Sequence, residues 1–120
     1  MKKKTLVIGA STNPERYSFL AVKKLLGHDQ EVVAIGLKEG EIGGLKIQTG
    51  KPLFDNIDTV TLYIAPAHQP EYYSYILSLK PRRIIFNPGT ENTEFEDLAT
   101  SAGIEIQEAC TLVLLSIGAY

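Results

Sequence analysis

Short apolar runs recur along the chain, and most of them stop at a glycine or a proline. They lie at residues 5–8, 32–35, 60–64, 83–86 and 104–106. Because their apolar positions are consecutive rather than alternating, these runs are typical of strands buried on both faces of a parallel sheet. The pattern therefore predicts five strands of one mainly parallel sheet.

Segments with the helical period separate these runs. Apolar residues recur every three or four positions at residues 19–26, 72–77 and 95–102, which predicts a helix in each crossover. Asn13 is suited to cap the first of these helices, and Pro14 is suited to be its first residue.

Two segments depart from the alternation. Residues 38–56 are rich in glycine and predict at most a short edge strand near residues 45–47, whereas residues 111–116 predict a short helix that closes on the sheet. Alternation of strand and helix over 120 residues indicates a single domain, residues 1–120. We expect a Rossmann-like fold, a doubly wound three-layer α/β/α arrangement with a mainly parallel five-stranded sheet.

Composition and charge exclude several function classes. The net charge of −2 gives no electrostatic basis for binding nucleic acid or an anionic membrane. The lysine run at residues 2–4 is too short for a targeting arm and is interpreted as a solvated start before a buried strand. No apolar stretch approaches the roughly 20 residues of a membrane span or the core of a signal peptide, so we expect a cytoplasmic protein.

In a sheet of this kind, ligands bind beyond the carboxyl ends of the strands, where the strand order reverses. The loops that meet there follow the first four predicted strands, and the residues after the first loop open a helix. For Tyr17, packing against the sheet is the alternative to ligand contact. The predicted binding residues are Gly9, Ala10, Ser11, Thr12, Asn13, Tyr17, Ser18, Gly36, Lys38, Ala65, Pro66, Asn87, Pro88 and Gly89.

The first of these loops has the chemistry of an anion site. Free amides at a helix start and the hydroxyls of Ser11 and Thr12 are donors for an anion. The loop is not the G-x-G-x-x-G motif, because Ser11 and Pro14 stand where the second and third glycines belong. A pyrophosphate therefore cannot approach the backbone as it does in dinucleotide enzymes. The alternative is a plain strand-to-helix turn.

The second loop indicates the kind of nucleotide. An NAD site has an Asp or Glu after the second strand that accepts from the ribose hydroxyls, whereas here the strand runs into Gly36-Leu37-Lys38. A lysine favours a phosphate near the adenosine ribose, and both NADP and coenzyme A carry one there. The alternative is a solvated loop lysine.

The order and spacing of four short motifs resemble those of the stand-alone CoA-binding proteins, which are similar to the N-terminal domain of the succinyl-CoA synthetase alpha subunit. The motifs are Gly9-Ala10-Ser11, Gly43-Gly44-Leu45-Lys46, Ala65-Pro66 and Glu108-Ala109-Cys110. The resemblance covers nearly the whole chain. It implies a Rossmann-like fold that holds CoA or acyl-CoA across these loops, usually with no assigned activity.

By position, the resemblance implies a role for several residues. Ser11 would face a phosphate, Lys38 would neutralise a phosphate near the adenosine, and Ala65 and Pro66 would line the nucleotide. Two positions depart from the family's pattern: many relatives have Asn-Pro at Gly36-Leu37, and a turn with Gln or Glu is common at Asn87-Pro88-Gly89.

Other chemistry-bearing residues are weaker candidates. His68 is a candidate general base in a ligand-side loop, but no partner carboxylate is evident and a structural role is favoured. Cys110, the single cysteine, is a candidate reactive thiol beside a helix start, and a buried inert thiol is favoured. Four acids are interpreted as belonging to the first turn of a helix rather than to a metal site: Glu91, Glu94, Glu96 and Asp97.

Nucleophile-elbow, Walker and zinc patterns are absent from the sequence. We therefore expect a non-catalytic module that binds CoA or acyl-CoA through its nucleotide portion, as a sensor or carrier with an unidentified protein partner. One alternative is an NADP-binding oxidoreductase or redox-sensing domain. The other is an interaction domain whose nucleotide site has decayed.

Overall fold

Strands and helices alternate along the computed structural model, which describes residues 3–120 and leaves Met1 and Lys2 of the lysine run outside. The first half contains β1 (Thr5–Ile8), α1 (Tyr17–Gly27), β2 (Val32–Ile35), β3 (Gly40–Ile42), β4 (Leu45–Gln48) and β5 (Thr59–Leu62). The second half contains the 3₁₀ turns η1 (Pro66–His68) and η2 (Pro70–Tyr72), then α2 (Tyr73–Leu79), β6 (Arg83–Phe86), α3 (Thr93–Ser101), β7 (Glu105–Glu108) and α4 (Thr111–Ser116).

Within residues 3–120 the sheet has seven strands in the order β3-β4-β2-β1-β5-β6-β7, and only the β3–β4 pair is antiparallel. The prediction of five strands is wrong. Gly43 and Gly44 have positive φ and form a tight turn, which lets β3 fold back along β4. β4 therefore pairs on both sides, with β2 and β3, and β3 is the edge strand instead.

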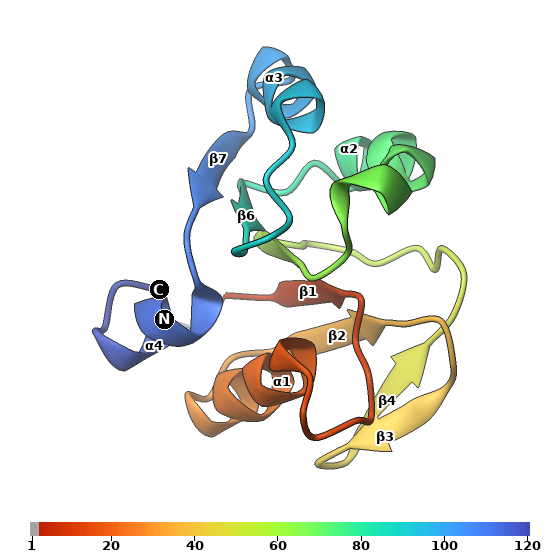
Figure 1. Cartoon of the computed structure of the whole chain (residues 1–120), viewed down its shortest axis with the longest axis vertical. Helices are drawn as coiled ribbons and strands as arrows, with labels where there is room; N and C mark the ends of the chain where they lie inside the picture. The colour runs from red at the N-terminus through yellow and green to blue at the C-terminus, as the bar shows by residue number, and fades with distance from the viewer. Residues whose placement is uncertain (1–2) are drawn as a thin grey trace.

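Helices cover both faces of the sheet: α1 and α4 lie on one side, and α2 and α3 lie on the other (Figure 1). Leu6 and Val7 are adjacent in β1 and point to opposite faces, and both are completely buried. Leu6 packs in the core under α2 and α3, whereas Val7 packs in the core under α1 and α4. This two-sided burial explains why the strands are continuous apolar runs, and the layers are those expected of a Rossmann-like fold.

The first helix begins later than the sequence predicted. Asn13 and Pro14 do not cap or open α1, because Arg16 is its N-cap and Tyr17 its first residue. The Asn13 side chain accepts from the amide of Glu15 at 3.0 Å, and its carbonyl accepts from the amide of Arg16 at 3.0 Å. These bonds form a separate turn ahead of the helix.

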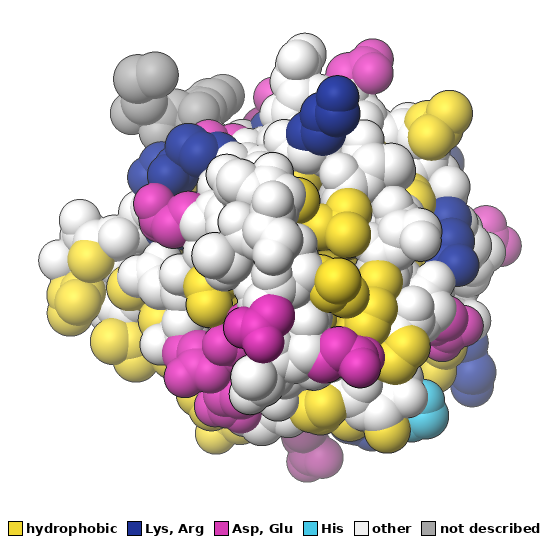
Figure 2. All heavy atoms as spheres, turned by 90° about the horizontal axis from the view of Figure 1, so that it is seen from above, with side chains coloured by type: hydrophobic (Ala, Val, Ile, Leu, Met, Phe, Trp, Pro, Cys, Tyr) yellow, Lys and Arg dark blue, Asp and Glu magenta, His cyan; other side chains and the backbone are white. Residues whose placement is uncertain are grey.

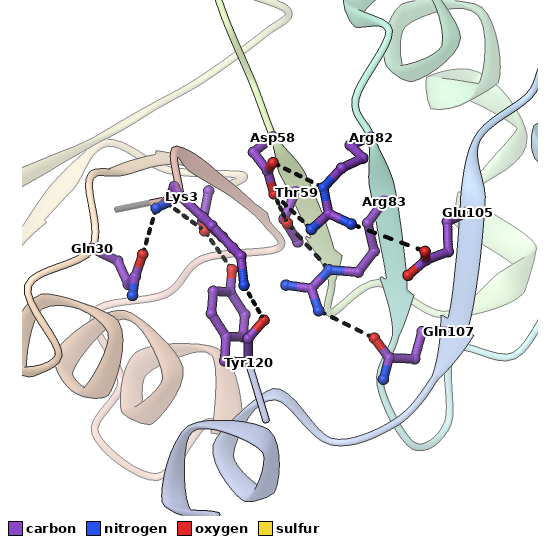
Figure 3. A network of polar contacts seen from close by, with 10 residues as sticks. Lys3, Gln30, Asp58, Thr59, Arg82, Arg83, Glu105, Gln107 and Tyr120 are labelled. Carbon is purple, nitrogen blue, oxygen red and sulfur yellow. Dashed lines mark hydrogen bonds and ion pairs between the residues drawn. The ribbon is translucent and has the colours of Figure 1, made fainter. Parts of the chain in front are cut away.

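A polar network lies at the amino ends of the strands (Figure 3). Arg82 Nε donates to Asp58 Oδ2 at 3.0 Å, and Arg83 Nε donates to Thr59 Oγ1 at 3.2 Å. The Arg83 guanidinium lies 4.6 Å from the centroid of the Tyr120 ring. These contacts join the starts of β5 and β6 to the segment after α4. In this described part of the chain, no helix is long and apolar enough to cross a membrane.

Candidate ligand-binding site

A cavity of about 870 Å³ lies at the carboxyl edge of the sheet, beside β1, where the strand order reverses. This volume is within the range of small-molecule sites, about 300–1,000 Å³. The loops after β1, β2, β5 and β6 all contribute to its wall. The lining residues are Gly9, Ala10, Ser11, Thr12, Arg16, Tyr17, Ser18, Leu37, Lys38, Glu39, Tyr63, Ile64, Ala65, His68, Glu71, Tyr72, Pro88, Gly89 and Thr90.

Two glycines allow the loops of this cavity to approach one another. Gly9 has a φ of 95°, and a Cβ on it would lie 2.8 Å from the carbonyl oxygen of Tyr63. A Cβ on Gly36 would lie 2.3 Å from the carbonyl oxygen of Ala10, closer than any real contact of that kind. The loop after β1 therefore packs backbone to backbone against the loops after β2 and β5, which only glycine permits at these two positions.

The first turn of α1 carries free donors into the cavity. Its first internal hydrogen bonds run from the amides of Phe19 and Leu20 to the Arg16 carbonyl, which leaves the amides of Tyr17 and Ser18 for another acceptor. Ser18 lines the cavity and is only 4% exposed. Its side chain is therefore held against the protein at the edge of the cavity. Donors of this kind favour a bound anion.

Charged side chains of both signs surround the mouth of the cavity. Arg16 and Lys38 are exposed, and so are Glu39, His68 and Glu71. Neither Arg16 nor Lys38 is part of a salt bridge in the described chain, where the ion pairs join other residues. Both cations are therefore available to a phosphate.

A sequence model of the CoA binding domain family matches residues 3–116. The chain belongs to this family. The resemblance to CoA-binding proteins that the sequence motifs indicated is thus confirmed.

Solved structures related to this CoA-binding domain share its fold. A crystal structure of an uncharacterized protein is 48% identical, with a TM-score of 0.97, over 100% of this chain and 99% of that one. A hypothetical protein from Pyrococcus horikoshii OT3 is 29% identical, with a TM-score of 0.84, over 93% of this chain and 80% of that one. A conserved hypothetical protein from Pyrococcus furiosus is 28% identical, with a TM-score of 0.76, over 89% of this chain and 92% of that one. No protein of curated function matches the chain.

Most of the residues predicted to bind the ligand lie together in this CoA-binding domain. The cavity wall includes Gly9, Ala10, Ser11, Thr12, Tyr17, Ser18, Lys38, Ala65, Pro88 and Gly89. Four of the predicted residues are not in this wall. Asn13 lies in the turn before α1, Gly36 packs against Ala10, Pro66 begins η1, and Asn87 faces a smaller cavity.

Asn87 is engaged with the protein rather than free for a ligand. It is 2% exposed, and its Nδ2 donates to Thr61 Oγ1 at 2.6 Å and to the Leu62 carbonyl at 2.8 Å. Its Oδ1 accepts from the Thr111 amide at 2.9 Å. All the polar atoms of this side chain therefore have partners inside the fold.

The cavity also contains residues that sequence analysis did not select. These residues are Arg16, Leu37, Glu39, Tyr63, Ile64, Glu71, Tyr72 and Thr90. The apolar run at residues 60–64 predicts Tyr63 and Ile64 in a strand. In the structure β5 ends at Leu62, so both residues belong to the loop that follows. Burial raises the pKa of Tyr63 to about 12, so its hydroxyl is neutral at physiological pH.

A smaller cavity of about 220 Å³ adjoins the larger one. Tyr17, Tyr63 and Pro88 line both cavities. Asn87, Cys110 and Leu112 complete the smaller one. Cys110 is the N-cap of α4, beside a helix start as the sequence predicts, and its side chain is half-buried.

Acidic side chains gather on part of the molecular surface seen from the side of α2 and α3 (Figure 2). Glu94 and Glu96 are in the first turn of α3, as predicted, whereas Glu91 precedes the N-cap Asn92 and Asp97 lies beyond the first turn. Glu96 Oε2 accepts from the amide of Asn92. A hydrogen bond to Glu96 and the charge of that residue raise the pKa of Glu108. Among the residues described, no three His, Cys, Asp or Glu side chains are placed to hold a metal ion.

Proposed function

We propose that the protein binds coenzyme A or acyl-CoA through its nucleotide portion, and that it acts as a sensor or carrier without chemistry of its own. Membership of the CoA-binding domain family supports the ligand. The observation that carries the proposal is the start of α1, where the amides of Tyr17 and Ser18 have no acceptor within the helix and the side chain of Ser18 lines the cavity.

The cavity matches the charges of this ligand. The first turn of α1 offers amides and a hydroxyl to the pyrophosphate, where the partial positive charge of the helix end is also favourable. Lys38 follows β2, on the side of the sheet where a Rossmann ligand places its adenosine ribose. Its ammonium is a compact charge that suits the 3′-phosphate of CoA.

The proposal that the module is non-catalytic rests on the sequence, where no nucleophile, base and orienting group can be placed together. His68 lines the cavity and is the residue to test. Wild-type protein should not hydrolyse or transfer acyl groups of CoA thioesters. Turnover that disappears in His68→Ala would overturn this part of the proposal.

A thermal-shift panel tests the ligand directly. The full chain is melted with CoA, acetyl-CoA, NADPH, NADH and buffer, each ligand at a series of concentrations. A ligand that binds only the native state adds about 2.7 kcal/mol at 100 times its dissociation constant. CoA should raise the melting temperature and NADH should not. A larger shift with NADPH would favour an NADP-binding protein, and no shift with any ligand would favour a decayed site.

Ser18→Ala tests the phosphate contact. Because the Ser18 side chain lines the cavity, removal of its hydroxyl should change unfolding by urea much less than it changes CoA binding. A hydrogen bond to a charged group contributes about 1.5–3 kcal/mol, so CoA should bind at least about tenfold more weakly. Ser74→Ala, on an exposed residue of α2, is the matched control and should change neither quantity. Unchanged CoA affinity in Ser18→Ala would remove the main support for the proposal.

A further inference from the structure

We propose that the smaller cavity receives the sulfur end of the ligand, and that it selects short, uncharged acyl groups carried as CoA thioesters. This inference rests on the proposed function and adds to it the class of acyl group. The two cavities share Tyr17, Tyr63 and Pro88 as a common wall, so a ligand in the larger one can extend into the smaller.

The order of the strands gives the direction in which the ligand lies. Lys38 follows β2, α1 follows β1, Pro88 follows β6 and Cys110 follows β7, and these strands cross the sheet in the order β2-β1-β5-β6-β7. Along CoA, the 3′-phosphoadenosine comes first, then the pyrophosphate, the pantetheine and the sulfur. With the first two parts at the ends of β2 and β1, the sulfur is directed toward β6 and β7. The smaller cavity lies at that place.

The wall of the smaller cavity is suited to an alkyl group. It consists of the Tyr17 and Tyr63 rings, Pro88 and Leu112, together with Asn87 and Cys110. The amide of Asn87 is already bonded to three groups of the fold, so it has no strong donor left for a ligand. A cysteine thiol behaves as a small apolar group with a weak donor. The cavity therefore offers no charged partner, and its buried donor is the neutral Tyr63 hydroxyl, which has no hydrogen-bond partner within residues 3–120. One neutral hydroxyl replaces only part of the hydration that a carboxylate would lose there.

The size of the smaller cavity limits how much of an acyl chain can be buried in it. A water molecule occupies about 30 Å³, so 220 Å³ holds about seven groups of that size. The sulfur and the carbonyl of a thioester take about three of them, which leaves room for about four carbon atoms. Acetyl and butyryl groups can be buried entirely within this limit, whereas the end of an octanoyl group would remain outside the cavity.

A ligand series measured by calorimetry on the full chain tests the inference. The ligands are CoA, acetyl-CoA, butyryl-CoA, octanoyl-CoA and succinyl-CoA, with adenosine 3′,5′-bisphosphate as a reference that lacks the pantetheine. Butyryl-CoA has two methylenes more than acetyl-CoA, and each buried methylene contributes a factor of about four, so butyryl-CoA should bind about fifteenfold more tightly. Octanoyl-CoA should gain nothing over butyryl-CoA. Succinyl-CoA should bind at least about tenfold more weakly than butyryl-CoA.

Leu112→Trp places a larger side chain in the smaller cavity, at a residue that does not line the larger one. This variant should lose the difference between acetyl-CoA and butyryl-CoA while it keeps the affinity for adenosine 3′,5′-bisphosphate, which shows that it is folded. Leu98→Trp, at a half-exposed position of α3 outside both cavities, is the matched control and should keep the whole series.

The wild-type series decides the inference even if Leu112→Trp does not fold. Equal affinity for all acyl groups, or the tightest binding for octanoyl-CoA or succinyl-CoA, would overturn it and leave the proposed function standing, provided that CoA and adenosine 3′,5′-bisphosphate bind. Failure of both of those ligands to bind would instead overturn the proposed function.

Discussion

Asn87 accepts a hydrogen bond from the backbone amide of Thr111 at 2.9 Å, which joins the carboxyl end of β6 to the first residue of α4. The same side chain donates to Thr61 and to the carbonyl of Leu62, so one amide connects two strands and a helix. Asn87→Leu removes these bonds and leaves buried backbone groups unpaired. We expect a loss of about 2–4 kcal/mol in the free energy of unfolding, measured with urea.

The exposed Asn13 provides the control for this prediction, because Asn13→Ala removes one bond in a surface turn. It should cost much less than Asn87→Leu. If Asn87→Leu weakened CoA binding and left unfolding unchanged, Asn87 would be a ligand residue as the sequence suggested.

Lys38→Ala should weaken CoA binding about tenfold or more, because a charge-assisted contact with the 3′-phosphate contributes roughly 1.5–3 kcal/mol. Dephospho-CoA lacks that phosphate, so its affinity should hardly change. Titration of both proteins with both ligands gives the coupling as a double-mutant cycle. Lys46→Ala, on an exposed lysine of β4 outside the cavity, is the control. Equal losses for the two ligands would show that Lys38 does not contact the 3′-phosphate.

Gly36→Ala should destabilise the fold, because its Cβ would lie 2.3 Å from the Ala10 carbonyl oxygen and the two loops would have to separate. Overpacking of this kind costs about 1–3 kcal/mol. Gly27→Ala is the matched control: a Cβ there meets nothing within 4 Å, and alanine in a helix is favoured over glycine by about 0.5–1 kcal/mol. Thermal unfolding should therefore shift in opposite directions in the two variants.

Cys110 should form a mixed disulfide with CoA when the protein is incubated with CoA disulfide. Its thiolate attacks one sulfur of the disulfide, the bond between the two CoA sulfurs breaks, and one CoA leaves as a thiolate. Intact mass should show one added CoA, and adenosine 3′,5′-bisphosphate should slow the reaction by competing for the larger cavity. Cys110→Ser should show no adduct. An adduct formed only in denaturant would mean that the thiol is simply buried.

Stability should depend on Asp58 in acid. Burial alone would raise the pKa of this carboxyl, but hydrogen bonds from Arg82 and Thr59 and the charges of Arg82 and Arg83 outweigh burial and hold the pKa below its ordinary value of 3.8. The folded state thus favours the ionised form, whose stabilisation is complete above about pH 4 and is lost as the pH falls through the lowered pKa. Asp58→Asn should flatten the fall in melting temperature below about pH 4, whereas Asp55→Asn should not. Parallel curves for wild type and Asp58→Asn would contradict this prediction.

The sequence predicts the strands that are buried on both faces, and it does so because burial there requires consecutive apolar residues. It underestimates the strands at the edges, where this requirement is relaxed. β7 contains Gln107 and Glu108 and has only its first part in the predicted run. β3 is a three-residue strand with a glycine and a glutamate, and it exists because the turn at Gly43 and Gly44 places it against β4.

The sequence predicts which loops form the site, but it does not predict the state of each side chain in them. A strand end and a topology rule are enough to bring Ser11, Lys38 and Gly89 to one cavity. The strand end and the topology rule do not reveal whether a side chain in such a loop already has its hydrogen bonds within the protein. The bond that occupies Asn87 comes from Thr111, which is 24 residues away along the chain and reaches it only in the folded protein. Tyr72 was missed because two 3₁₀ turns precede α2 and carry that residue to the cavity.

The polar network of Asp58, Arg82, Arg83 and Tyr120 lies at the amino ends of the strands, whereas both cavities lie at their carboxyl ends (Figure 3). The length of the strands thus separates the two edges from each other. Thermostability can be engineered at the first edge by redesigning charges while ligand affinity is tuned at the second, and gains made separately should add when the two sets of substitutions are combined.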